Sequence, residues 1–301
     1  MMAENPYGAW VENFVTALHT GEAIGGEAIG TAEMAAPEHP PEAVGAPKAL
    51  VFAPHPDDEV ITGGLPLRLL RERGFTVVDV AVTLGSRVER RTGRWRELEA
   101  ACAYIGFGLI TPDRTGLEGI NLEARGRDPA RWALAVEAVA DVLAAGQPDV
   151  VFLPHAADWN VTHVGVHHLV VEAMRRLPAL ACRVVETEYW SAMTTPNLMV
   201  ESTPADVADL VAALSLHVGE VARNPYHLRL PAWMMDNVRR GAELVGGQGG
   251  AAPRFAFATL YRLRGWKEGQ FHDILKEGES VAAADSLEKL FPPKGEDKLW
   301  R

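Results

Sequence analysis

Cysteine is nearly absent from the 301-residue sequence, which contains only Cys102 and Cys182. Both lie in apolar surroundings that look like a helix and a strand, so a disulfide framework is not expected. A zinc site built from cysteine is disfavoured for the same reason. Any metal ion would therefore be held by histidine and carboxylate side chains.

Positive charge is also scarce. The chain has 29 Lys and Arg residues against 40 Asp and Glu residues, which gives a formal net charge of −11. Because backbone phosphates and acidic lipids repel such a surface, nucleic acid and anionic membranes are disfavoured as partners. A small neutral or cationic substrate fits this charge better.

Long apolar runs are missing as well. No stretch of about 18 uncharged apolar residues occurs, so we expect no insertion into a membrane. The first residues, MMAENPYGAW, lack the basic segment and apolar run of a secretory signal. The sequence therefore predicts a cytoplasmic protein.

From Lys48 onward, apolar strand patterns alternate with helical patterns. The expected strands are 48–53, 75–83, 148–155, 182–190 and 255–263, and the expected helices are 59–73, 93–107, 130–145, 162–177 and 207–221. The strands are apolar on both faces, which indicates a sheet buried on both sides. We therefore expect an α/β fold with a mainly parallel sheet covered by helices on each side.

The two ends of the chain differ in composition from its centre. Residues 1–47 hold a short helical pattern and then a segment rich in Ala, Gly, Pro and Glu, which indicates an N-terminal arm and linker. Such an arm can pack against a neighbouring subunit, so a homo-oligomer is one expectation. Residues 48–265 form the expected catalytic domain. The charged, proline-containing tail, 266–301, is expected to pack on the surface or fray.

An unusual turn follows the first expected strand. The apolar run "LVFAPHPDDEVITG", residues 50–63, is interrupted at His55 and then presents three adjacent acids. Adjacent carboxylates repel one another, and a turn without a further role would be more stable with Gly, Asn or Ser. We therefore expect a cation to bind at this turn. An alternative is that the acids cap the first turn of the following helix, which explains the acids but not His55.

Three residues fit a metal site. His55 and Asp58 lie three residues apart in a tight turn, a spacing that lets both bind one ion at about 2.0–2.2 Å. The loop after strand 148–155 opens toward the same edge of the sheet, and its His163 is the best-placed third ligand. A His/Asp/His set leaves a position open for water, as catalytic zinc sites do. An alternative is that His163 only borders the hydrophobic core and binds no ion.

Asp57 lies beside these ligands but points differently from Asp58. It is therefore free to take a proton from water, whose pKa a bound ion lowers to about 7. His167 follows His163 by one helical turn, yet "HVGVH" lacks the Glu of the zincin motif, so a protease of that class is rejected. No Gly-x-Gly-x-x-Gly follows the first strand, so a dinucleotide-binding oxidoreductase lacks its main signature.

These motifs together resemble a known family. "APHPDDE", "RWRELEAACAYIG" (94–106) and "LSLHVGEV" (214–221) are similar to motifs of the PIG-L/LmbE-like N-deacetylases, over about residues 48–263. The resemblance implies a Rossmann-like, three-layer α/β/α fold. It also implies zinc-dependent hydrolysis of an N-acyl group, most simply acetyl, on an amino sugar or a related small amide.

Carried over by position, the resemblance makes His55, Asp58 and His163 the metal ligands. Asp57 becomes the general base, and Arg94 matches an arginine that helps to hold the substrate in family members. Because two histidines and one carboxylate also suit ferrous iron, Fe²⁺ or another divalent ion is an alternative to zinc.

The chain departs from the family in its second loop, which reads "NVTH" where the family commonly reads His-Pro-Asp-His or His-x-x-His. Asn160 thus stands where a histidine often stabilises the oxyanion. An amide donor of this kind can contribute about 2.7–4 kcal/mol, but it cannot donate a proton. That role would fall to Asp57, His155 or His217. A degenerate member that binds metal and an acylated ligand without turnover is therefore the alternative function.

Overall fold

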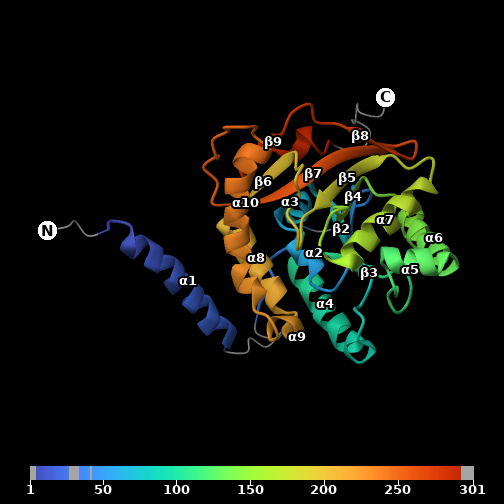
Figure 1. Cartoon of the computed structure of the whole chain (residues 1–301), viewed down its shortest axis with the longest axis horizontal. Coiled ribbons are helices and arrows are strands. Elements are labelled where there is room, and N and C mark those ends of the chain that lie inside the picture. The colour runs from blue at the N-terminus through green and yellow to red at the C-terminus, as the bar shows by residue number, and fades with distance from the viewer. Residues whose placement is uncertain (1–4, 27–33, 41–42, 293–301) are drawn as a thin grey trace.

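Residues 5–26, 34–40 and 43–292 are described by a computed structural model, which is drawn in Figure 1. They contain a nine-stranded sheet in the order β3-β2-β1-β4-β5-β7-β6-β9, with β8 paired to β7 outside this path. The strands are β1 (Lys48–Ala53), β2 (Thr76–Ala81), β3 (Gly108–Ile110), β4 (Val150–Pro154), β5 (Cys182–Thr187), β6 (Leu198–Ser202), β7 (Phe257–Lys267), β8 (Gln270–Asp273) and β9 (Glu279–Val281).

Helices lie on both faces of this sheet (Figure 1). The α-helices are α1 (Gly8–Gly26), α2 (Asp58–Ile61), α3 (Gly64–Arg73), α4 (Arg91–Ile105), α5 (Leu122–Arg127), α6 (Pro129–Gly146), α7 (Val161–Arg175), α8 (Pro204–Ser215), α9 (Val218–Val221) and α10 (Leu230–Leu244). Three short 3₁₀ helices are η1 (Val88–Arg90), η2 (Tyr226–Arg229) and η3 (Leu287–Lys289). Among the described residues, none of the helices combines the length and apolarity that crossing a bilayer requires.

The central strand β1 shows how the three layers are held together. Ala49 and Val51 pack into one core cluster with side chains of α3, α4 and α8. Leu50 and Phe52 point to the other face and pack with side chains of α6 and α7. Successive strand residues alternate between faces, so a run that is apolar at every position is buried on both sides. The expected three-layer α/β/α fold with a mainly parallel sheet is confirmed.

The order of the strands places the loops that matter for function. β1 pairs in parallel with β2 on one side and with β4 on the other, and β4 pairs in parallel with β5. The strand order therefore reverses between β1 and β4, and the carboxyl ends of these two strands lie side by side. In open α/β sheets, ligands bind in the crevice at such a switch point.

A break divides the single helix expected over residues 59–73 into α2 and α3. Gly63 between them has φ 91°, and a Cβ there would lie 2.4 Å from the Oγ1 of Thr259 on β7. The hydroxyl of Tyr261, also on β7, donates a hydrogen bond to the carbonyl oxygen of Thr62 at 2.8 Å. The close approach of β7 therefore requires glycine at the break and fixes where α2 ends.

The structure differs from the surface packing or fraying expected for the tail. β7 continues to Lys267, β8 pairs with β7, and β9 pairs with β6. Trp266, Leu287 and Phe291 are almost completely buried. Residues 293–301 lie outside the described residues.

The N-terminal arm holds a longer helix than the pattern in residues 1–20 indicates. α1 extends to Gly26 and points away from the sheet (Figure 1). Its aromatic side chains Trp10 and Phe14 are exposed. Near its end, a Cβ on Gly21 would lie 3.1 Å from the side chain of Leu228 in η2. Within the expected linker, residues 27–33 and 41–42 lie outside the described residues.

Phe291→Ala tests the place of the C-terminal segment in the core. Removing a buried phenylalanine leaves a cavity, so the free energy of unfolding should fall by about 3 kcal/mol or more. Leu134→Ala, at an exposed position of α6, is the control and should change it by less than about 0.5 kcal/mol. Urea denaturation followed by circular dichroism measures both. Equal stability of the two variants would show that the segment does not contribute to the core.

Candidate metal centre

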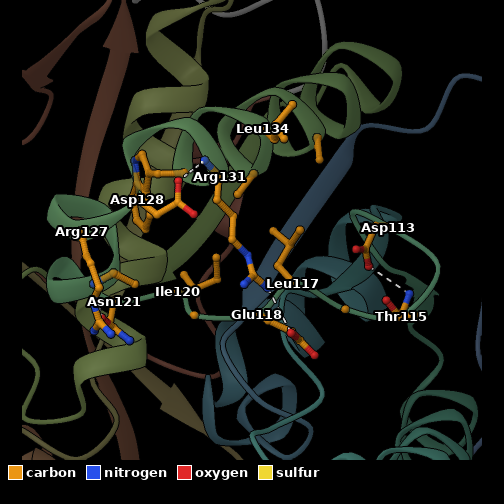
Figure 2. Close-up of a pocket in the computed structure, with 16 residues that line it drawn as sticks. Asp113, Thr115, Leu117, Glu118, Ile120, Asn121, Arg127, Asp128, Arg131 and Leu134 are labelled. Carbon is orange, nitrogen blue, oxygen red and sulfur yellow. Dashed lines mark hydrogen bonds and ion pairs between the residues drawn. The ribbon is translucent and has the colours of Figure 1, made fainter.

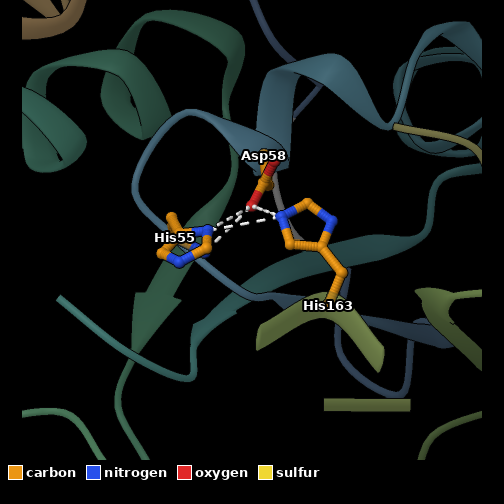
Figure 3. Close-up of side chains that lie close together, drawn as sticks. All are labelled: His55, Asp58 and His163. Carbon is orange, nitrogen blue, oxygen red and sulfur yellow. Dashed lines mark hydrogen bonds and ion pairs between the residues drawn. The ribbon is translucent and has the colours of Figure 1, made fainter. Parts of the chain in front are cut away.

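His55, Asp58 and His163 come together at the crevice between β1 and β4, as Figure 3 shows. His55 lies in the loop after β1, Asp58 is the first residue of α2, and His163 lies in the first turn of α7. The Nε2 of His163 lies 3.2 Å from the Oδ2 of Asp58 and 3.3 Å from the Nδ1 of His55. The Nδ1 of His55 lies 3.3 Å from the same Asp58 oxygen.

These separations suit a small divalent ion. Tetrahedral bonds of about 2.0 Å place their ligand atoms about 3.3 Å apart. Asp58 and His163 are buried, whereas His55 remains partly exposed. Two imidazoles and one carboxylate match the ligand types of zinc and ferrous iron, and the exposed side of His55 leaves room for water or substrate. The cluster therefore fits the ion that the sequence predicts.

Electrostatics bind the three groups to one another even without an ion. Burial opposes charge on the His163 imidazole, but the carboxylates of Asp58 and Asp158 raise its pKa to about 10. Burial likewise opposes charge on Asp58, but His163 and His55 lower the pKa of its carboxyl group. A proton on His163 thus supplies positive charge where a metal ion would supply it, and the ion must displace that proton to bind.

Asp158 faces the second ring nitrogen of His163. Its Oδ2 lies 3.7 Å from the Nδ1 of His163, on the side of the ring that faces away from Asp58. The Asp158 side chain is held in turn by the backbone N–H groups of Asn160, at 2.8 Å, and Trp190, at 3.3 Å. This separation is too long for a hydrogen bond but close enough for an ion pair, and a carboxylate beside a metal-binding histidine raises its basicity.

The third acid, Glu59, holds the turn together. Its Oε2 accepts a hydrogen bond from the backbone N–H of Asp57 at 2.8 Å. Its Oε1 lies 2.7 Å from the Nε2 of His217, and both side chains are buried. Asp57 itself has φ 115°, a backbone region that residues other than glycine rarely adopt. Glu59 and His217 therefore stabilise a strained turn that aims the two aspartates in different directions.

Asp57 is held by Tyr226, whose hydroxyl donates a hydrogen bond to its Oδ2 at 2.5 Å. Burial and the neighbouring Asp58 raise the pKa of Asp57 to about 7. A carboxyl group with this pKa can accept and return a proton near neutral pH, which suits a general base. The expected role of Asp57 is consistent with this geometry and stays a prediction.

The other two histidines considered as proton donors are already engaged. His217 is completely buried and its Nε2 is used by Glu59. His155 is buried and its Nε2 lies 2.9 Å from the carbonyl oxygen of Ser191. The Nε2 atoms of both histidines are therefore already bonded, which argues against these atoms as the proton donor for a leaving amine.

Asn160 and Arg94 occupy supporting positions near the cluster. The Oδ1 of Asn160 accepts a hydrogen bond from the backbone N–H of Thr162 at 2.9 Å and so caps α7. Only the amide Nδ2 of Asn160 is left as a donor. The Arg94 guanidinium donates to the carbonyl oxygen of Pro56 at 3.1 Å and lies 3.7 Å from Glu220. Arg94 thus holds the turn that carries His55.

Two polar cavities lie beside the loop Leu117–Asn121. The larger, about 800 Å³, lies between this loop and α6, where Arg131 reaches Glu118 at 3.0 Å (Figure 2). It includes none of the three cluster residues. The second, about 520 Å³, is lined by His55, Arg91 and Arg94 among others. The second cavity is therefore the one that reaches the cluster, at His55.

Sequence reasoning missed the roles of Tyr226, Asp158 and Glu59. Tyr226 lies 169 residues after Asp57 in a 3₁₀ helix, where no periodicity marks it. Asp158 follows β4 by four residues, and its place before the His-bearing helix is the one signal that pointed to it. Glu59 was recognised as part of an acid cluster, but only the fold shows that it binds backbone and His217.

A family model agrees with the motifs. Residues 50–174 match the model of the PIG-L family, described as GlcNAc-PI de-N-acetylase. This segment contains all three cluster residues together with Asp57, Arg94 and Asn160. The resemblance expected from the sequence is confirmed over these residues. No curated protein sequence matches the chain significantly.

Solved structures share the fold at low sequence identity. N,N′-diacetylchitobiose deacetylase from Pyrococcus horikoshii is 19% identical, with a TM-score of 0.51 over 74% of this chain and 85% of that chain. A deacetylase of teicoplanin biosynthesis is 13% identical, with a TM-score of 0.53 over 71% and 97%. GalB, the 4-carboxy-2-hydroxymuconate hydratase from Pseudomonas putida KT2440, is 17% identical, with a TM-score of 0.52 over 72% and 95%.

Asp158→Asn tests the contact between Asp158 and His163. An amide in place of the carboxylate weakens the interaction with Nδ1, so the affinity for Zn²⁺ should fall by about 10- to 100-fold. Competition with a chromophoric chelator measures the affinity. Asp236→Asn, at an exposed position of α10, is the matched control and should not change it. An unchanged affinity in Asp158→Asn would rule out this role.

His167, on the same helix, should make stability depend on pH. Its Nδ1 lies 2.8 Å from the carbonyl oxygen of Pro154 and must donate to it, and burial lowers the pKa of His167 to about 4. The unfolded chain therefore binds a proton between pH 6.5 and 4 that the folded chain does not. Stability attributable to His167 should fall across this window as pH falls, by up to about 3 kcal/mol.

The comparison of His167→Asn with wild type isolates this contribution. Asparagine keeps an N–H donor for Pro154 but does not titrate, so urea denaturation should show a weaker loss of stability between pH 6.5 and 4. His272→Asn, at an exposed position, is the control and should follow the wild type. Parallel pH profiles for all three proteins would contradict the assignment.

Proposed function

We propose that the chain is a metal-dependent hydrolase that removes N-acyl groups, because residues 50–174 match the PIG-L family around a His/Asp/His cluster. The observation that carries the proposal is the approach of three ligand atoms to within 3.2–3.3 Å, beside a carboxylate that does not belong to the set. A purely structural ion would need neither an accessible ligand side nor a second acid.

The ion supplies two kinds of chemistry when bound: it polarises an amide carbonyl and lowers the pKa of water. His55, Asp58 and His163 would hold it, and zinc is the proposed ion, with ferrous iron as the alternative. Asp57 takes a proton from the attacking water. Its hydrogen bond from Tyr226 leaves Oδ1 for that proton and keeps the carboxylate in place.

The developing negative charge on the amide oxygen needs a donor from the protein. Asn160 is the proposed one, because its Oδ1 is used to cap α7 and its Nδ2 remains to donate. Capping fixes the amide plane, so the donor needs no rearrangement when charge develops. Arg94, which lines the polar cavity with His55, is proposed to hold the substrate.

Collapse of the tetrahedral state requires a proton on the leaving amine. We assign this step to Asp57, which received a proton from water one step earlier. His155 and His217 are buried and bonded elsewhere, which supports the assignment. The products are a free amine and a carboxylate.

The names of the similar proteins suggest the substrate class. The family description and two of the solved structures refer to deacetylation, of N-acetylglucosaminyl-phosphatidylinositol, diacetylchitobiose and a compound of the teicoplanin pathway. An N-acetylated amino sugar or related small amide is therefore the proposed substrate of this chain. The negative net charge fits a neutral substrate of this kind.

The departure at Asn160 favours one other function. If the site needs a histidine at this position, the chain would bind a metal ion and an acylated ligand without cleaving it. The capping bond to Thr162 gives Asn160 a structural use that is independent of catalysis. The same experiment separates the two functions.

The test is release of free amine from N-acetylglucosamine, N,N′-diacetylchitobiose and simple N-alkylacetamides by protein loaded with Zn²⁺ or Fe²⁺. A fluorogenic amine reagent follows the reaction. Asp57→Asn should lower the rate by about 10²- to 10⁴-fold, because it removes the general base but no ligand. His163→Ala should lose bound metal, measured by elemental analysis.

Asp236→Asn is the control for a change from Asp to Asn and should keep the full rate. No release from any compound by metal-loaded protein would favour the binding function. Release that continues at the wild-type rate in Asp57→Asn would overturn the proposed mechanism.

A further inference from the structure

A third cavity, of about 230 Å³, adjoins the cluster on the side of Tyr226. Its lining is mostly apolar and aromatic. The lining residues are Ile61, Tyr189, Trp190, Leu214, Tyr226, Arg229, Leu230 and Trp233. It shares no lining residue with the polar cavity that contains His55 and Arg94.

This apolar cavity begins one side chain away from the reacting groups. Tyr226, in its wall, donates the 2.5 Å hydrogen bond to Asp57. Tyr189, also in its wall, packs edge-on against the His163 ring with 4.9 Å between ring centroids. A group bound in the cavity would therefore lie next to both the general base and a metal ligand.

The hydroxyl groups of both tyrosines already have hydrogen-bond partners, so these residues present their ring surfaces to the cavity. The Tyr189 hydroxyl lies 2.8 Å from the Oγ1 of Thr62, and the Tyr226 hydroxyl binds Asp57. Trp190 completes this surface in a T-shaped contact with Tyr226 at 6.3 Å. Arg229, which is exposed, is the one charged residue in the lining.

Size and exposure distinguish this cavity from a packing defect. A cavity of about 150 Å³ lined by apolar side chains holds a benzene molecule, so the present one has room for a ring with a short linker. Trp190, in the cavity wall, is 52% exposed, so part of its ring surface is in contact with water. An apolar group that covers it would remove this surface from water.

We propose that the substrate carries an apolar group, an aromatic ring or a short alkyl chain, that binds in the cavity lined by Trp190, Tyr226 and Trp233. The amide then lies at the metal cluster, and the polar part of the substrate faces Arg91 and Arg94 in the other cavity. The inference rests on the proposed hydrolysis and narrows its substrate class. The apolar group belongs either to the acyl part or to the amine part of the amide.

Two series of compounds identify the source of that group. The first varies the acyl part in N-acetyl-, N-butanoyl- and N-phenylacetylglucosamine. The second varies the amine part in the methyl and benzyl glycosides of N-acetylglucosamine. In one series kcat/KM should rise by about tenfold or more from the smallest to the ring-bearing compound. When the compounds are hydrolysed, a rise in neither series overturns the proposal.

Variants of the wall test whether the preference comes from this cavity. Trp233→Ala should reduce the preference to less than about threefold, whereas Trp233→Phe should keep most of it. Trp190→Ala, at a half-exposed position, should reduce the preference as well and disturbs folding less. Trp10→Ala, on α1, is the matched control and should keep the full ratio. A ratio unchanged in both wall variants overturns the proposal.

A binding measurement separates failure of this inference from failure of the proposed hydrolysis. Calorimetry with metal-loaded Asp57→Asn compares the methyl and benzyl glycosides and the acetyl and phenylacetyl compounds, without turnover. Tighter binding of a ring-bearing compound that Trp233→Ala removes supports the cavity even if no compound is hydrolysed. Hydrolysis without any preference in rate or binding would support the hydrolase but overturn the apolar subsite. Equal or undetectable binding of the two compounds in each pair would also overturn the apolar subsite.

Discussion

The close approach of His55, Asp58 and His163 is the constraint on which the rest of the site depends. Asp58 and His163 are withdrawn from water, and such groups are stable together only when positive charge lies among them. Strand order supplies the geometry, because β1 and β4 are neighbours and end at the same edge. The loop after β1 and the helix after β4 therefore begin close together, which brings the three side chains into contact.

The same turn shows why three consecutive acids are compatible with a stable fold. Each carboxylate has a different partner: Asp57 binds Tyr226, Asp58 faces the two imidazoles, and Glu59 binds backbone and His217. The positive φ of Asp57 costs on the order of 1–3 kcal/mol, which the buried contacts of Glu59 offset. Repulsion is avoided because the turn sends the three side chains in different directions.

The sequence predicts the parts of this molecule that are local. Strand β1 and the spacing of His55 and Asp58 are visible within about ten residues, and strand ends at a shared edge point to His163. Tyr226 escapes prediction because its partner is distant in sequence and a 3₁₀ helix has no pattern. The tail was misjudged because its charged and proline-containing composition is typical of a surface segment, whereas Trp266, Leu287 and Phe291 are buried by contacts that depend on the fold. The break at Gly63 was open to prediction from its glycine pair, which an unbroken helix would not favour.

All lining residues of the apolar cavity except Ile61 follow residue 174, whereas the metal cluster, Asp57 and Asn160 precede it. The two parts of the chain remain coupled, because Tyr226 binds Asp57 and His217 binds Glu59 from the later part. A change that reshapes the cavity wall at Tyr226 would therefore also disturb the turn that carries the acids. Substitutions that alter the cavity and leave this turn unchanged are confined to wall residues without such contacts, such as Trp233.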